Sequence, residues 1–452
     1  MTIHRAGKLL GLLPFIILVL WLLAYGSSEY PYGDTYTFSA RTAIATVDGR
    51  LSVEEFLQIS NGHRILFSRL VTAFLTITTQ WDTRLEVMVN VLLAGSNVLL
   101  AVALIKKFAP SVVPLAWFPM SLLLLSVDQM INWVSGVQSL WHFTLFCLLA
   151  NLNLLAGENR RGWKMGLVIF LSLFATFSAG NGMVIWACVV GAMLILRYDE
   201  RLVGVIVIIG ILAVLGYLHD SGIGMKDQAD VVLYGEIGIA NPQKIAKLVL
   251  IFIGRPLADR IEIAPLIGLG GVILLYYALI TRQRGVWIWA LVAGYSLLSA
   301  LQIALTRIHH FDVEVGFAER YFSISIAFWV ALCGMWFVRL ANQPNQNPVG
   351  TRLIASLQTI PNTKKIRLLP FLIILLICAT HLIALSFQAG RTDWHNPVNH
   401  AMLEGECIRR YPITHEGLCN GWIVPDAAIT DRLIERRLSG FARSAFLPKN
   451  DS

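Results

Sequence analysis

Long apolar blocks alternate with shorter polar connections along most of the chain. The blocks run for roughly 15 to 21 residues, about the length that an α-helix needs to cross the hydrocarbon core of a bilayer. Irregular backbone and open sheet edges cannot face lipid, because their polar groups would be left without hydrogen bonds. The pattern therefore predicts an all-α, polytopic membrane protein of about eleven transmembrane helices. The predicted spans are 9–25, 85–105, 110–127, 140–156, 166–180, 183–196, 203–218, 262–281, 286–305, 321–339 and 368–387.

The composition agrees with this class of protein. Of the 452 residues, 56% are hydrophobic and only 14% are charged, whereas soluble proteins carry about a quarter charged residues. The first block, Leu9 to Tyr25, follows Arg5 and Lys8 and so resembles the start of a signal peptide. It lacks a small-x-small cleavage site and further apolar blocks follow it, so we interpret it as an uncleaved first span.

The basic residues of the connections predict the orientation, because cytoplasmic connections carry an excess of Lys and Arg. With these spans, the basic connections fall on the same side as the N-terminus, which gives an N-in, C-out topology. They hold Lys106, Lys107, Arg160, Arg161, Lys164, Arg197, Arg201, Arg282, Arg284, Arg352, Lys364, Lys365 and Arg367. Counting 245–258 as a span would break this pattern, so we interpret it as an interfacial or re-entrant helix. The net charge of +8 suits anionic lipid headgroups and requires no nucleic-acid partner.

Two domains follow from this topology. Residues 1–387 form a multi-span transmembrane domain, and residues 388–452 form a small outer tail. Cys407 and Cys419 both lie in that tail, where an oxidising compartment would favour a disulfide between them.

The first outer loop, 26–84, is expected to contain interfacial helices. Two helices are predicted on either side of Asp48-Gly49, and Ser52 with Glu55 forms a capping box for the second one. The apolar run from Ile65 to Thr79 is short for a span, so we expect it to lie at the membrane boundary.

Two acidic residues lie where predicted spans meet the outer surface. Asp34 comes nine residues after the first span and is surrounded by tyrosines that could stack on a sugar. Asp128 directly follows an apolar run. Either carboxylate could act as a general base, and a solvated turn residue is the alternative for Asp34.

Basic and aromatic side chains gather at the same predicted face. Arginines there could bind a phosphate through a bidentate fork, or could snorkel toward lipid headgroups. Trp141 shares a helical face with Gln138, although an aromatic belt would also explain a tryptophan there. His309, His310 and Asp312 could ligate a metal, so a divalent metal ion stays open as a cofactor. The candidate phosphate- or substrate-binding residues are His63, Arg64, Arg69, Gln138, Trp141, Arg307, Arg320 and Tyr321.

Together these features resemble the GT-C superfamily of membrane glycosyltransferases, which use polyprenyl-phosphate-linked sugars as donors. The matching features are Asp34 in Tyr32-Gly33-Asp34 of a long first outer loop, Asp128 in the next outer loop, and Arg320-Tyr321 opening a late span. The resemblance implies that Asp34 is the catalytic base and Asp128 a second acidic site residue. It places Arg320 near the lipid phosphate.

The resemblance also implies an inverting sugar transfer on the periplasmic or extracellular face of the cytoplasmic membrane. The partners would be a polyprenyl-phosphate-linked sugar, membrane lipid, and a glycan, lipid or protein acceptor. Asp34 lacks an adjacent acidic partner, which leaves metal use and the acceptor open. The competing class is a transporter or flippase of lipid-linked or anionic small molecules, which would place ionisable residues or broken helices near the midplane. The predicted spans carry almost no charge at their centres, which favours the transferase.

Overall fold

The structure, a computed structural model of the chain, is almost entirely helical. It describes residues 3–25, 31, 34–60, 63–157, 161–219, 242–307, 312–342, 362–389 and 427–442. The β structure in these ranges is one antiparallel hairpin, formed by β1 (Ile59–Ser60) and β2 (His63–Arg64). The prediction of an all-α fold is confirmed, apart from this short hairpin.

Each predicted span coincides with a helix. These helices are α1 (Ile3–Tyr25), α5 (Thr83–Phe108), η2 with α6 (Pro110–Val112 and Val113–Leu124), α8 (Ser139–Leu155), α9 (Gly162–Thr176), η4 with α10 (Gly180–Met183 and Val184–Ile195), α11 (Glu200–Leu218), α14 (Ala264–Leu279), α15 (Arg284–Arg307), η7 with α16 (Glu319–Tyr321 and Phe322–Ala341) and α17 (Asn362–Ala389).

Five of the described helices are long and apolar enough to cross a membrane: α5, α11, α15, η7 with α16, and residues 369–387 of α17. Several others, including α6, α9, α10 and α14, are apolar but shorter. The protein is therefore helical with five candidate membrane-spanning helices in its described part. The number of eleven spans and the N-in, C-out orientation stay predictions.

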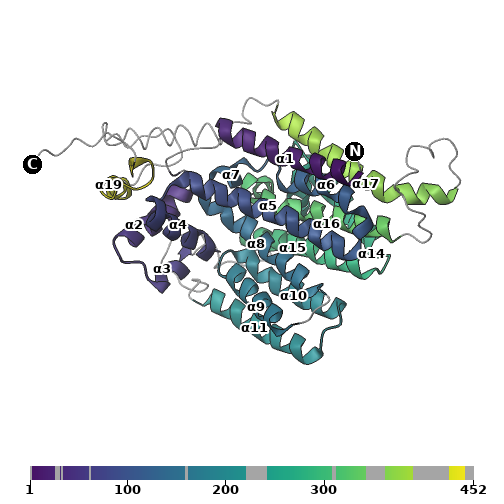
Figure 1. The fold of residues 1–452 in the computed structure, drawn as a ribbon, viewed down its shortest axis with the longest axis horizontal. Helices are drawn as coiled ribbons and strands as arrows, with labels where there is room; N and C mark the ends of the chain where they lie inside the picture. The colour runs from purple at the N-terminus through teal and green to yellow at the C-terminus, as the bar shows by residue number, and fades with distance from the viewer. Residues whose placement is uncertain are drawn as a thin grey trace, which may run out of the picture.

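The centre of the bundle is formed by α8 and α16 (Figure 1). Every residue from Phe322 to Val338 of α16 is buried, since this helix packs against α15, α6 and α17. A helix that is apolar on all sides is expected in such a buried position. Gly334 allows the close approach of α15, because a Cβ there would lie 2.3 Å from the Trp289 ring.

The described residues of 34–84, which belong to the predicted first outer loop, form a helical layer at one end of the bundle, called the first-loop layer below (Figure 1). It contains the π-helix η1 (Thr35–Ser39), α2 (Ala40–Val47), α3 (Val53–Leu57) and α4 (Leu66–Thr79). The predicted break at Asp48-Gly49 is confirmed, because α2 ends there. The Ser52 side chain accepts a hydrogen bond from the Glu55 backbone N–H at 3.2 Å, which is the Ser52 half of the predicted capping box.

Two further segments pack on the bundle and on the first-loop layer, respectively. The predicted interfacial segment 245–258 is α13 (Pro242–Gly254) followed by η5 (Arg255–Leu257), and α13 packs on α14 and α15. In the tail, α19 (Ala427–Glu435) and η9 (Ser439–Ala442) are described, and α19 packs on α2 (Figure 1). Cys407 and Cys419 lie outside the described residues, so their disulfide stays a prediction.

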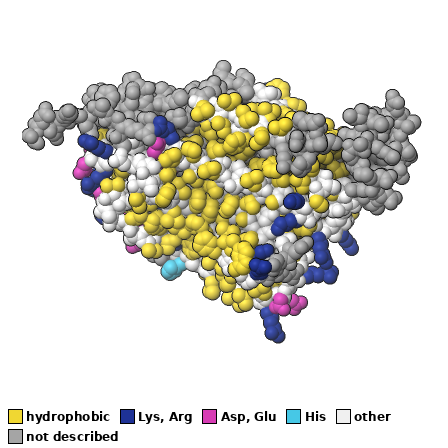
Figure 2. Space-filling view, in the orientation of Figure 1, with side chains coloured by type: hydrophobic (Ala, Val, Ile, Leu, Met, Phe, Trp, Pro, Cys, Tyr) yellow, Lys and Arg dark blue, Asp and Glu magenta, His cyan; other side chains and the backbone are white. Residues whose placement is uncertain are grey.

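The visible surface carries a broad band of hydrophobic side chains, with most charged side chains toward its two ends (Figure 2). Large apolar residues are exposed along α1, α11, α14 and α17, including Leu23, Leu212, Leu266 and Leu376. A water-soluble protein rarely exposes apolar area on this scale. The band is therefore the surface expected to face lipid.

Candidate functional site

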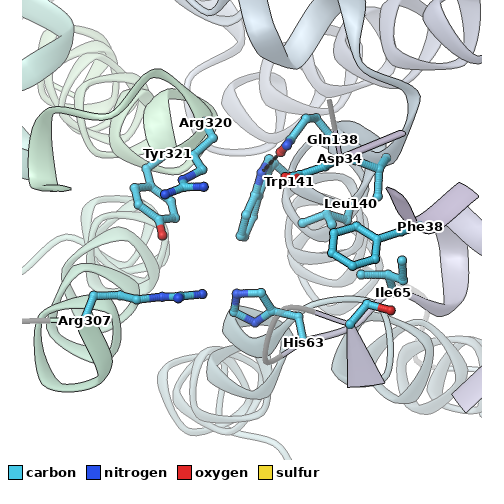
Figure 3. Close-up of a pocket in the computed structure, with 12 residues that line it drawn as sticks. Asp34, Phe38, His63, Ile65, Gln138, Leu140, Trp141, Arg307, Arg320 and Tyr321 are labelled. Atoms are coloured by element: carbon cyan, nitrogen blue, oxygen red, sulfur yellow. Dashed lines mark hydrogen bonds between the residues drawn. The ribbon is translucent and has the colours of Figure 1, made fainter. Parts of the chain in front are cut away.

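A pocket opens between the first-loop layer and the ends of α15 and α16. It encloses about 420 Å³, part of which is open to solvent. Its walls come from segments far apart in the sequence, including η1, the β hairpin, α8 and η7 (Figure 3). The lining residues are Asp34, Phe38, Ser60, His63, Ile65, Val137, Gln138, Leu140, Trp141, Arg307, Arg320 and Tyr321. Seven of the ten residues predicted as catalytic or as phosphate- or substrate-binding therefore meet in one place.

Asp34 immediately precedes η1 and is partly buried. Its carboxylate makes no capping hydrogen bond to that helix. Burial raises the pKa of the Asp34 carboxyl above its ordinary value, while Arg320 and then Arg307 act against burial and lower it. Short π-helical turns are rare and occur frequently at functional sites. A carboxyl group with a raised pKa beside two guanidinium groups can exchange a proton with a bound molecule.

His63 stands on β2 and faces Arg307 across the pocket (Figure 3). Its ring meets the Trp141 ring edge-on, with centroids 6.1 Å apart. Burial, with the nearby charges of Arg307 and Arg320, lowers the pKa of His63 to about 3. The imidazole is therefore neutral at physiological pH, and its Nδ1 is buried without a hydrogen-bond partner in the described residues.

Arg307 and Arg320 supply the positive charge of the pocket. Arg307 is the last residue of α15 and is buried, while Arg320 belongs to the short η7 helix. The Arg320 guanidinium lies 5.4 Å from the centroid of the Tyr321 ring, and its Nε is buried with no hydrogen-bond partner among the described residues. A buried guanidinium N–H without a partner costs free energy unless a bound group accepts from it. Arg320 is therefore suited to an anionic ligand.

The Trp141 ring forms an aromatic wall of the pocket between Asp34 and His63, and Gln138 lies beside it (Figure 3). The Trp141 indole N–H donates to the Gln138 side-chain oxygen, which fixes the ring orientation. Trp141 also packs edge-on against Tyr321, with centroids 5.9 Å apart. Its neighbour His142 points elsewhere and stacks on Trp133. The indole edge and face thus offer the pocket a flat apolar surface.

Arg64 and Arg69 do not line the pocket. Arg64 donates to the backbone carbonyls of Leu57, Tyr217 and His219. Arg69 donates to the carbonyls of Glu55 and Gln58 and to the Ser60 hydroxyl. These hydrogen bonds tie β2 and α4 to residues 55–60 and to the end of α11. The geometry therefore supports neither the predicted phosphate contact nor the snorkelling alternative.

Asp128 is also absent from the pocket. Its carboxylate forms a bidentate ion pair with Arg255, at 2.6 and 3.1 Å, and both side chains are buried. Arg255 additionally donates to the Phe317 carbonyl at 3.1 Å and lies over the rings of Phe317 and Phe322. Asp128 therefore joins the chain before α8 to η5 and to the residues before α16. This arrangement is typical of a structural pair, and does not support its prediction as a second acidic site residue.

Five lining residues were not singled out from the sequence: Phe38, Ser60, Ile65, Val137 and Leu140. Phe38 lies one turn after Asp34, and Val137 and Leu140 lie within two residues of Gln138. Closeness in sequence to a predicted site residue was therefore the one signal that could have indicated them. No group of three His, Cys, Asp or Glu side chains that could hold a metal ion occurs within the described residues. His309 and His310 lie outside them, and Asp312 caps η6 (Val313–Phe317).

Comparisons with known proteins return no relative: no protein-family model, no curated protein and no solved structure matches the chain. The chemistry of the pocket therefore has to be argued from its own residues. A proton acceptor, two fixed cations, a neutral imidazole and an aromatic wall can bind an anionic ligand and take a proton from a group next to it.

Proposed function

We propose that the protein is a membrane glycosyltransferase that moves a sugar from a polyprenyl-phosphate donor to an acceptor hydroxyl. The observation that carries the proposal is the convergence of Asp34, Arg307 and Arg320 on one pocket at the end of an apolar helical bundle. The lipid tail would lie along the apolar band, while its phosphate reaches the arginines. The reaction would take place at the periplasmic or extracellular face of the cytoplasmic membrane, in the eleven-span, N-in and C-out topology.

The transfer would proceed with inversion. The acceptor oxygen attacks the anomeric carbon as its proton passes to Asp34, and the bond from that carbon to the phosphate oxygen breaks. The electron pair of this bond leaves with the phosphate. Arg320 and Arg307 would stabilise the growing negative charge, an effect of about 3 kcal/mol per well-placed donor. The Trp141 ring would hold the sugar by stacking.

The proposal predicts that Asp34 is needed for transfer and not for folding. Asp34→Asn keeps the shape of the side chain but removes the basic oxygen, so turnover should fall by roughly two to four orders of magnitude. The measurement is release of free polyprenyl phosphate by the purified, reconstituted protein, with a panel of hexosyl and pentosyl polyprenyl phosphates. This product forms whichever acceptor is used.

The matched control is Asp199→Asn. Asp199 lies outside the pocket and caps α11, where its side chain accepts from the backbone N–H groups of Arg201 and Leu202. Asn fills this role equally well, so turnover should be unchanged. Near-normal transfer by Asp34→Asn would show that Asp34 is not the base. If the wild-type protein released no polyprenyl phosphate but moved the lipid-linked sugar across vesicles, the transporter or flippase reading would replace the proposal.

A further inference from the structure

A second apolar cluster joins the tail to the first outer loop. The loop side comprises Tyr36, Ala40, Ala43, Ile44 and Trp81, and the tail side comprises Ile429, Leu433 and Leu438. All eight side chains are buried. The cluster is separate from the main core of the bundle, so α19 is the element that covers this face of η1 and α2 (Figure 1).

Polar contacts fix the position of α19 within this cluster. The Tyr36 hydroxyl and the Thr430 hydroxyl share a buried hydrogen bond of 2.7 Å. The Ser439 backbone N–H donates to the Gln80 carbonyl at 2.8 Å. Asp48, at the end of α2, pairs with Arg436 at 3.0 Å, although Arg436 is 44% exposed. Exposed ion pairs contribute little, so the buried hydroxyl pair and the apolar contacts dominate.

The hydroxyl pair acts on the same short helix that follows Asp34. Tyr36 points from η1 toward α19, while its neighbour Thr35 bonds to the Ser135 hydroxyl at 2.9 Å, just before η3 (Gly136–Gln138). The π-helix is thus held from two sides. Because the Asp34 carboxylate makes no capping bond of its own to η1, the backbone of η1 decides where that carboxylate lies in the pocket.

We propose that α19 is a latch that positions Asp34, with Tyr36 and Thr430 as the positioning residues. This inference rests on the proposed transferase function. Loss of the hydroxyl pair would loosen η1 and turn the carboxylate away from the acceptor, without touching the arginines that bind the donor phosphate. The rate of the chemical step would therefore fall while donor binding stays the same.

Thr430→Val tests the latch because it removes the hydroxyl and keeps the shape. We expect kcat to fall roughly 3- to 10-fold, in line with the loss of one buried hydrogen bond, with the donor KM within about twofold of wild type. Tyr36→Phe should have the same effect from the other side of the bond. Thr430→Ser restores a hydroxyl and should recover most of the rate. The matched control is Thr78→Val, because Thr78 is exposed on α4 and its hydroxyl donates to the Phe74 carbonyl of the same helix at 2.8 Å.

Amide hydrogen exchange over residues 34–47 provides a readout that does not depend on activity. Exchange should be faster in Thr430→Val and Tyr36→Phe than in wild type and Thr78→Val. Unchanged exchange in both variants overturns the latch, whatever the activity. Faster exchange with unchanged kcat overturns its positioning role. Absence of transfer by the wild-type protein would instead count against the proposed function, and exchange alone would then decide whether α19 holds η1.

Discussion

Burial and nearby positive charge shift the pKa of the Asp34 carboxyl in opposite directions, and the pH dependence of transfer can separate the two effects. Burial raises the pKa of its carboxyl above 3.8, and Arg320 and Arg307 hold that rise back. The base must be ionised to accept a proton, so kcat/KM should decline as the pH falls through this raised pKa. Arg320→Gln removes one of the restraining charges, and the acid limb of the profile should therefore move to higher pH.

The comparison for this pH profile is Arg260→Gln, since Arg260 is 68% exposed and pairs with Asp259 outside the pocket. Its acid limb should coincide with that of wild type. His63, with a pKa of about 3, should contribute no step between pH 5 and 8. An acid limb that stayed in place in Arg320→Gln would show that Asp34 is not the titrating group.

Gly136 is a residue whose identity the packing dictates. A Cβ at this position would lie 1.9 Å from the Glu86 Oε2 atom, while Glu86 Oε1 is held by Thr72 at 2.7 Å and by Trp81 at 2.9 Å. Gly136→Ala should therefore lower the free energy of unfolding by about 1–3 kcal/mol through overpacking. Gly95→Ala is the control, because an added Cβ there would meet no described atom within 4 Å apart from the adjoining backbone of its own helix. It should be neutral or slightly stabilising in thermal unfolding of the solubilised protein.

Among the elements, η5 and the segment before α8 depend on the ion pair between Arg255 and Asp128. Asp128→Leu alone would leave a buried guanidinium without its partner and should destabilise the protein by about 3–5 kcal/mol. Replacing both residues, by Asp128→Leu with Arg255→Met, removes the charge altogether and should recover much of that loss. Thermal unfolding of the single and double variants measures the recovery.

Transfer by the same double variant tests the role of Asp128. We expect activity within tenfold of wild type, because neither residue of the pair lines the pocket. A double variant that is stable yet inactive would restore Asp128 as a second acidic site residue.

The positions of the helices could be predicted from the sequence, whereas most side-chain contacts of the site could not. Apolar blocks and the Ser52 cap are local signals, so each predicted span coincides with a helix and the break at Asp48-Gly49 was placed correctly. Whether an arginine binds a ligand or the protein itself depends on tertiary neighbours. Arg64 and Arg320 look alike in the sequence, yet Arg64 meets three backbone carbonyls and Arg320 faces the pocket.

For the molecule as a whole, the orientation in the membrane is the prediction with the widest consequences. Reporter fusions after Arg284 and after Phe387 should report opposite sides, with the first in the cytoplasm. The contact of α19 with α2 requires those two helices to lie on the same side, as the N-in, C-out topology has them. Fusions that both reported the same side would contradict this topology, and with it the outer location of the pocket.

The docking of α19 also imposes an order on biosynthesis. Thr430 is 394 residues from Tyr36, its hydrogen-bond partner. At roughly 5–20 residues per second, the ribosome needs about 20 to 80 s to make the intervening chain. During that interval Tyr36, Ile44 and Trp81 lack their cover, although the helices around them can already have entered the membrane. The nascent protein therefore carries an uncovered apolar face, which a chaperone could bind and a protease could recognise, until residues 427–442 emerge and dock.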